Sequence, residues 1–444
     1  MITDYAATGP QELWNMARLQ AYLENVGSPF STGSDICNCD ALTPQILGDF
    51  EDEPDRQYDT PATDPAPWYD EDVPVSGDFL GFLPTSVSGT TNNPYTRTVS
   101  NAVGGGGVFG PRRAGPRTIT VTGLLVGSTC CAVEYGMHWL AEALAGCSGS
   151  ACDGDCFTLY DCCPEPGDDP DEFNRQHRRT FRRVALVDGP REINRAGSPD
   201  CGRGQCSGGE IVEVEFTLVA ATPWAWTETE ERLNIELEAE QSDDCVEWCA
   251  TRSGPNCQGE PCAFAACRDG RDPCADPRNP VPRPPRPSLP ETSFCVPFAP
   301  DIRCFELDMS TRPGWSDDAV TVTLMAGVAP LRNVRVVMYE KRSDDPRDCD
   351  TIADEQRCFP ANEFVVTYVP AGGGVVIDGQ TGGATTQCFD VCQTASTVFG
   401  DQDGGPLEVK PLTCAMYCVC IETDSVFPPA RGSRVIVSTS GRGY

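Results

Sequence analysis

The sequence predicts a mainly β protein with a few helices, and three observations lead to this prediction. In residues 210–220, apolar side chains alternate with polar ones, which is the period of a half-buried strand. Beyond residue 300, β-branched or alternating runs follow one another with turn signals between them. Only residues 11–25 and 133–145 have the apolar spacing of helices. Many short strands with few helices indicate sheets packed into barrels or sandwiches.

The first predicted helix lies near the N-terminus. In residues 11–25, Leu13, Met16 and Leu23 fall near one face of a helical projection. Gly27 is expected to end this helix because glycine readily adopts the backbone conformation of a helix stop.

An acidic, proline-rich segment follows between residues 49 and 72. It holds ten carboxylates and four prolines, and its only basic residue is Arg56. A segment of this composition has little apolar surface to bury, so it predicts a solvated arm or long loop.

The second predicted helix, over residues 133–145, has a buried stripe and a glycine stop. The stripe consists of Val133, Met137, Leu140 and Leu144. Gly146 follows as the C-cap. Strands are predicted on either side, at residues 117–123 and 181–187.

A block without periodicity separates two strand-rich parts of the chain. Residues 243–290 hold six cysteines and end in a proline-rich run, which favours a semi-rigid linker. We therefore expect four regions. They are an N-terminal helix with the acidic arm (1–99), a strand-rich domain (100–235), a Cys/Pro-rich insert and linker (236–290), and a β-sandwich (291–444).

The charge of the chain excludes several kinds of partner. With 33 basic and 66 acidic residues the net charge is −33, so nucleic-acid phosphates and anionic lipids would be repelled. No apolar run approaches the roughly 18 residues that a membrane span requires, so no membrane insertion is expected. The N-terminus shows no basic region followed by an apolar one, so synthesis in the cytosol is expected.

The 26 cysteines suit an oxidised extracellular protein better than a cytosolic one. Their spacing favours disulfides, because the densest cluster lacks the C-x2-C pairs of zinc sites. Free thiols and zinc binding remain alternatives, and no other cofactor is expected. Three pairs of cysteines are spaced as small disulfide loops: Cys201 with Cys206, Cys295 with Cys304, and Cys349 with Cys358. The cysteines expected in disulfides are these six together with Cys245, Cys249, Cys257, Cys262, Cys267 and Cys274.

The two histidines limit the catalytic chemistry that the chain can perform. No nucleophile motif lies near His138 or His177, so no enzymatic activity is expected. His138 is expected to pack or to form a hydrogen bond.

His177 lies in the one strongly basic stretch, whose arginines are Arg175, Arg178, Arg179, Arg182 and Arg183. These arginines have two interpretations, a solvated face or a contact with acidic residues of a neighbouring subunit, because guanidinium groups match carboxylates in bidentate fashion. Glu51, Asp52 and Glu53 of the acidic segment are the expected partners in the second case.

Two sets of segments carry a resemblance to a known family. The first set is RTITVTGLLVG, the helix VEYGMHWLAEALAG and the strand EVEFTLVAATPWAW. The second is LRNVRVVMYE, FVVTYVPAGGGVVIDGQTG, GPLEVKPLTCAMYCVCIETD and SRVIVSTSGRGY. The first resembles the N-terminal split β-barrel of siphophage distal tail proteins, and the second is similar to their galectin-like C-terminal β-sandwich. Within this family, the segments most resemble those of minor tail proteins of actinobacteriophages.

The resemblance implies a structural virion protein that forms a ring, commonly hexameric, between the tail tube and the tail tip and supports host attachment. Its implied partners are copies of itself, the tail tube protein, the hub of the tip and other minor tail proteins. DNA would pass through an acidic lumen without specific binding, because like charge removes sites that would hold phosphate. The protein would be made in the bacterial cytoplasm and act at the virion tail tip. The alternative is a receptor- or glycan-binding adhesion module of the tail tip.

Overall fold

A computed structural model describes most of the chain outside the Cys/Pro-rich insert. The described residues are 4–9, 11–28, 39, 41–50, 52–53, 55–91, 95–146, 154–197, 209–237, 245–249, 293–297, 301–388, 391–424 and 428–443. Strands predominate in these ranges, so the predicted mainly β fold with a few helices is confirmed.

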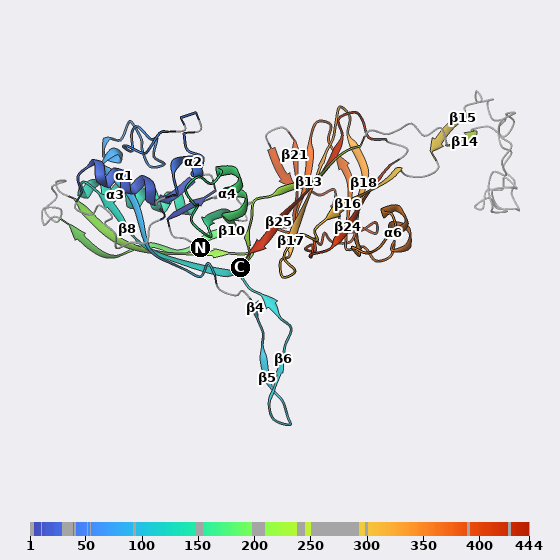
Figure 1. The fold of residues 1–444 in the computed structure, drawn as a ribbon, viewed down its shortest axis with the longest axis horizontal. Helices are drawn as coiled ribbons and strands as arrows, with labels where there is room; N and C mark the ends of the chain where they lie inside the picture. Colours follow the sequence, from blue (N-terminus) through green and yellow to red (C-terminus); the bar gives the residue numbers. More distant parts are fainter. Residues whose placement is uncertain are drawn as a thin grey trace, which may run out of the picture.

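The first half of the chain forms one curved antiparallel sheet with helices packed on it (Figure 1). The strands follow the order β2 (Gln11–Asn15), β1 (Tyr5–Thr8), β9 (Asp155–Tyr160), β10 (Arg178–Gly197), β11 (Glu210–Ala220), β8 (Arg117–Gly127) and β3 (Phe79–Ser88). The sheet curls until its end strands face each other, since the rings of Trp14 on β2 and Phe82 on β3 are 5.5 Å apart. This curvature agrees with the barrel that the resemblance implies.

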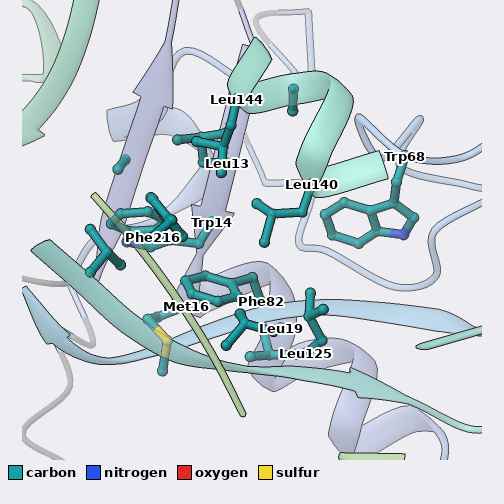
Figure 2. Packing of buried hydrophobic residues seen from close by; sticks show 14 of the residues in the cluster. Leu13, Trp14, Met16, Leu19, Trp68, Phe82, Leu125, Leu140, Leu144 and Phe216 are labelled. Carbon is teal, nitrogen blue, oxygen red and sulfur yellow. The ribbon is translucent and has the colours of Figure 1, made fainter. Parts of the chain in front are cut away.

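Large apolar side chains fill the inside of this curved sheet. Trp14, Phe82 and Phe216 are almost completely buried, and Leu140 reaches them from helix α3 (Cys130–Ala145) (Figure 2). The predicted α3 is confirmed, with Val133, Leu140 and Leu144 buried and Met137 partly buried. The helix begins one turn earlier than predicted because the Thr129 side chain accepts a hydrogen bond from the Ala132 amide.

The helix predicted over residues 11–25 is only partly correct. Residues 11–15 form β2, and helix α1 (Met16–Asn25) begins after it. The Asn15 side chain accepts the Arg18 amide hydrogen at 3.2 Å, which caps the helix at this point. Pairing of β2 with β1 satisfies the backbone before the cap, so tertiary pairing overrides the helical pattern there.

The acidic segment is a long loop, one of the two structures that its composition predicts, because its described residues form no helix or strand. It is not solvated throughout, however. Tyr58, Ala66 and Trp68 are buried in the first core. The Trp68 indole also donates to the Phe79 carbonyl oxygen at 2.9 Å. Apolar residues spaced among the carboxylates therefore bind the segment to the domain. Helix α2 (Pro44–Leu47) precedes the segment and the 3-10 turn Pro74–Asp78 follows it.

The second half of the chain is a β-sandwich, as predicted. One sheet has the order β13 (Glu230–Glu236), β25 (Arg434–Gly443), β17 (Asp318–Met325), β20 (Gly374–Asp378), β21 (Gly383–Cys388) and β22 (Val391–Thr394). The other has the order β16 (Asp301–Asp308), β24 (Met416–Thr423), β18 (Leu331–Lys341), β19 (Asn362–Val369) and β23 (Val398–Phe399). Val322, Val336, Phe364 and Val437 are among the side chains buried between them.

One strand of the sandwich comes from before the insert. β13 pairs with β25, although the sequence assigns residues 230–235 to the first domain. The backbone N–H and C=O groups along the edge of β25 that faces away from β17 need hydrogen-bond partners, and β13 supplies them. The chain then leaves the sandwich, forms the pair β14 (Cys245–Cys249) and β15 (Ser293–Pro297), and returns as β16.

A narrow hairpin projects from the body of the molecule (Figure 1). We call residues 95–114 the arm. Its base is the pair β4 (Tyr95–Thr96) and β7 (Arg113–Ala114), and its outer part is the pair β5 (Val99–Asn101) and β6 (Gly107–Phe109). Gly105 and Gly106 turn the chain at the tip with φ of 90° and 84°, a region that favours glycine.

Candidate functional site

The predicted basic stretch lies at the junction of the two halves. Arg178, at the start of β10, pairs with Glu228 at an Nη1–Oε1 distance of 3.3 Å. Arg182 donates from Nε to Oε1 of Gln380 at 2.7 Å, and Gln380 follows β20 in the sandwich. These two arginines therefore connect the first domain to the linking segment and to the second domain.

The other predicted arginines are also engaged near this junction. Arg175, in helix α4 (Pro170–His177), pairs with Glu172 one turn earlier. Arg179 pairs with Asp161 at the end of β9. Arg183 lies where the register between β9 and β10 shifts, and it has a φ of 57°. The arginines of the basic stretch thus mainly contact residues of their own chain.

The two halves share a continuous sheet at this junction. β12 (Ala225–Trp226) pairs with β10 on one side and with the last residues of β25 on the other. The Arg442 guanidinium lies 4.1 Å from the centre of the Trp224 ring and pairs with Asp317. Backbone pairing and these side-chain contacts hold the two halves together.

A cleft of about 600 Å³ lies beside this junction. Its charged lining consists of Arg175, Arg179, Arg232, Arg312 and Arg442 with Glu172, Glu228, Glu230 and Asp318. All five arginines pair with carboxylates of the same chain. The cleft is therefore close to neutral, which makes it a poor receptor for an anion.

The predicted acidic contact residues are only partly described. Glu51 lies outside the described residues, and Asp52 is exposed. Glu53 pairs with Arg56, at 3.3 Å between Oε1 and Nη1. Contact between these acids and another subunit stays a prediction.

A buried ionic network holds the acidic segment against helix α1. The Arg18 side chain is 4% exposed and pairs with Glu12 at 3.0 Å and with Asp49 at 2.9 Å. The Tyr58 hydroxyl donates to Oδ2 of Asp49 at 2.7 Å. Burial raises the pKa of Glu12 above its usual range, although Arg18 opposes this shift. The network is structural, because it lies inside the first domain and joins its own segments.

In the described part of the second domain, two disulfides crosslink its elements. Cys304 on β16 bonds to Cys420, which lies directly opposite on β24. Cys349, at the start of helix α6 (Cys349–Glu355), bonds to Cys418 of the same strand. Cys418 and Cys420 face one side because strand side chains alternate.

The small disulfide loops predicted at Cys295–Cys304 and Cys349–Cys358 are therefore wrong, and Cys358 carries a free, exposed thiol. Cys349, at the start of helix α6, packs in a buried cluster with Cys418 and Cys420, whereas Cys358 lies exposed beyond the end of the helix. The bonded partners are 116 and 69 residues apart, which local spacing does not reveal. Cys245, Cys249 and Cys295 lie in β14 and β15. The remaining predicted cysteines, Cys201, Cys206, Cys257, Cys262, Cys267 and Cys274, lie outside the described residues.

The structure groups His177 with two residues that the sequence did not single out with it. Nδ1 of His177 is 2.8 Å from Oδ1 of Asp161 and 2.9 Å from Sγ of Cys162. The other histidine, His138, is exposed on α3. Cys162 precedes His177 by 15 residues, and one strand end and one helix end bring them together. The only signal for this grouping in the sequence was that His177, one of the two histidines, follows a Cys-rich segment.

This grouping does not have the geometry of a nucleophilic triad. In a triad the acid and the nucleophile contact opposite nitrogens of the imidazole ring. Here Asp161 and Cys162 both face Nδ1. Burial raises the pKa of the Cys162 thiol, and the Asp161 charge raises it further, whereas a nucleophilic cysteine needs a lowered pKa.

The arm exposes several apolar side chains. Val99 and Phe109 lie opposite each other across its two strands and are 63% and 67% exposed. Val108 and Val103 are also exposed. Between residues 95 and 114 there are three arginines and no carboxylate, in a chain whose net charge is −33. The arm is thus an apolar and basic projection on an acidic protein.

Comparisons with known proteins find no matching sequence family, and three solved structures that they return have TM-scores of 0.34 to 0.36. Neither a family model nor a curated protein sequence matches the chain. The SPP1 Dit protein, described as a paradigm of the hub adsorption apparatus in phages that infect Gram-positive bacteria, is 11% identical with a TM-score of 0.35. That comparison covers 81% of this chain and 93% of the Dit chain.

Two structures of the phage P2 baseplate in its activated conformation, with Ca and with Sr, are 8% and 9% identical, with TM-scores of 0.36 and 0.34. Each covers 81% of this chain and 90% of the baseplate chain. Among the described residues, no helix is long and apolar enough to cross a membrane.

Proposed function

We propose that this protein is a structural phage tail protein, a distal tail or minor tail protein whose copies form a ring between the tail tube and the tail tip. The observation that carries the proposal is the projecting arm with its exposed Val99 and Phe109. The same proposal includes attachment to tube and tip proteins, support of host attachment, passage of DNA through the ring without specific binding, and no catalytic role.

The arm is suited to binding another molecule. A two-stranded hairpin with no further strand or helix against it is marginally stable in water. Burial of a valine or phenylalanine side chain contributes roughly 1.5–3 kcal/mol, so covering Val99 and Phe109 would stabilise the arm and the contact together. Its base is held by Tyr95, whose ring lies 5.4 Å from that of Trp224.

The charge of the arm favours a second copy of this chain as its partner. Arg97, Arg112 and Arg113 are exposed on the arm. The rest of the molecule carries a large excess of carboxylates. A basic projection that meets an acidic body is attracted to it and repelled by other basic projections, which favours a head-to-tail contact. Head-to-tail contacts close into rings when the rotation between neighbours permits.

The oligomeric state of the full-length protein tests this proposal. Light scattering coupled to size exclusion should give an oligomer for the wild type and a monomer for the double variant Val99→Ser/Phe109→Ser, with rings visible by electron microscopy only for the wild type. Ile193→Ser is the matched control, because Ile193 is 50% exposed on β10 outside the arm. A wild-type monomer at high protein concentration would contradict the proposal, as would an unchanged mass in the double variant.

A further inference from the structure

Three different metal-binding atoms meet where β9 ends and α4 ends. They are a carboxylate oxygen of Asp161, Sγ of Cys162 and Nδ1 of His177, all within 4.8 Å of one another. The ring nitrogen is 2.8 Å from the carboxylate oxygen and 2.9 Å from the sulfur. One imidazole nitrogen thus faces both other donors, as it would if all three shared a cation.

The backbone holds these side chains together. The Asp161 amide donates to the His177 carbonyl oxygen at 3.0 Å, which ties the strand end directly to the helix end. The Tyr160 hydroxyl donates to Oδ1 of Asn174 at 2.6 Å, and the Tyr160 ring stacks on Phe173 at 5.6 Å. The two elements are therefore in place before any ion binds, which lowers the cost of forming a site.

The donor set selects among metals. A thiolate, an imidazole and a carboxylate are the three ligand types of zinc sites, whereas calcium and magnesium prefer oxygen alone. The second oxygen of Asp161 pairs with Arg179, an outer contact of the kind that orients a ligating carboxylate. The side chains of Asp161 and His177 are 30% and 32% exposed, so an ion can reach them from solvent.

The geometry needs only a small adjustment. Zinc bonds of about 2.0–2.3 Å in a tetrahedral site place the ligand atoms roughly 3.3–3.8 Å apart. The contacts at the His177 nitrogen must therefore open by less than about 1 Å, which small side-chain rotations supply. Because three protein ligands are present, water would fill the fourth position.

We propose that Asp161, Cys162 and His177 bind one Zn²⁺ ion. The bond that forms is a zinc–thiolate bond, and the thiol proton of Cys162 is released to solvent. The ion would crosslink β9 to α4 at the domain junction, next to Arg178 and Arg179. This inference is independent of the ring proposal, because it concerns donors within one chain.

Titration of the purified full-length protein with Co²⁺, which reports thiolate ligation by its absorption, tests the site. The wild type should take up one ion with a thiolate-to-cobalt band and release about one proton per ion. Zn²⁺ should then displace the cobalt. Cys162→Ser and His177→Gln should each lose the band and weaken Zn²⁺ binding by at least about tenfold, the smallest effect expected even for an outer-shell contact.

Matched controls separate this site from the other cysteines. Cys414→Ser removes another free thiol and His138→Gln removes the other histidine, and both should bind as the wild type does. Absence of the thiolate band in the wild type would overturn the proposal, as would an unchanged band in Cys162→Ser. If His177→Gln fails to fold, as judged by circular dichroism, the near-isosteric Cys162→Ser decides the question.

Discussion

The replacement Arg18→Met removes the central cation of the buried network and keeps a side chain of similar length. Arg18 pairs with Glu12 at 3.0 Å and with Asp49 at 2.9 Å, and the side chains of Arg18 and Glu12 are 4% and 9% exposed. At 3 Å and an effective dielectric of about 20, one such pair is worth about 5 kcal/mol of attraction. Removing one partner of a buried pair costs about 3–5 kcal/mol, because the other charge stays buried. We expect the first domain to lose free energy of unfolding in this range.

Urea unfolding followed by tryptophan fluorescence measures this loss, because Trp14 and Trp68 are buried in the first core. The loss should depend on pH. Burial already raises the pKa of Glu12, and removal of Arg18 raises it further. A carboxyl whose folded pKa is raised contributes stability at low pH and loses it as pH rises. The deficit of Arg18→Met should therefore shrink as the pH is lowered from neutrality toward the acidic range.

Two controls make the interpretation specific. Adding Glu12→Gln to Arg18→Met should restore part of the stability and reduce the pH dependence, because the unpaired carboxylate is gone. Arg191→Met breaks a pair whose arginine is 60% exposed and should change stability little. A loss below about 1 kcal/mol for Arg18→Met, with no dependence on pH, would refute the reasoning.

Two further predictions concern a helix packed on the first core and a disulfide of the second. Gly136→Ala should destabilise the first domain by about 1–3 kcal/mol in calorimetry. The added Cβ would lie 2.2 Å from a ring atom of the buried Phe79, which outweighs the roughly 1 kcal/mol gain in helix propensity; a stabilised variant would show that the ring moves aside freely. Cys418→Ser breaks the bond to Cys349 and should lower the stability of the second domain by about 2–5 kcal/mol, with the first domain unchanged. Cys358→Ser serves as its control, and equal unfolding temperatures for the two variants would contradict this prediction.

The sequence patterns that predicted the fold correctly were those in which apolar residues recur on one face of a helix or strand. The alternation in β11 and the stripe on α3 mark which side chains are buried, and both elements are present as expected. The N-terminal helix failed at residues 11–15, where hydrogen bonding to β1 competes with the helix. The acidic segment is the predicted long loop, but its burial was missed because composition averages over carboxylates and over the few apolar residues, such as Trp68, that bind it to the core.

For the candidate sites too, the sequence predicted the features that depend on neighbouring residues and missed those that depend on distant ones. Local order along the chain established the mainly β class, the sandwich of the second half and the basic stretch at residues 175–183, because each depends on neighbours in sequence. The pairing of Cys304 with Cys420, the intrachain partners of the arginines, the grouping of Asp161 with His177 and the exposure of the arm come from residues brought together by folding. Such contacts depend on which strands pair and in which register. Many strands of this chain share the same alternating pattern, so the pattern of one strand does not identify its partner or its register.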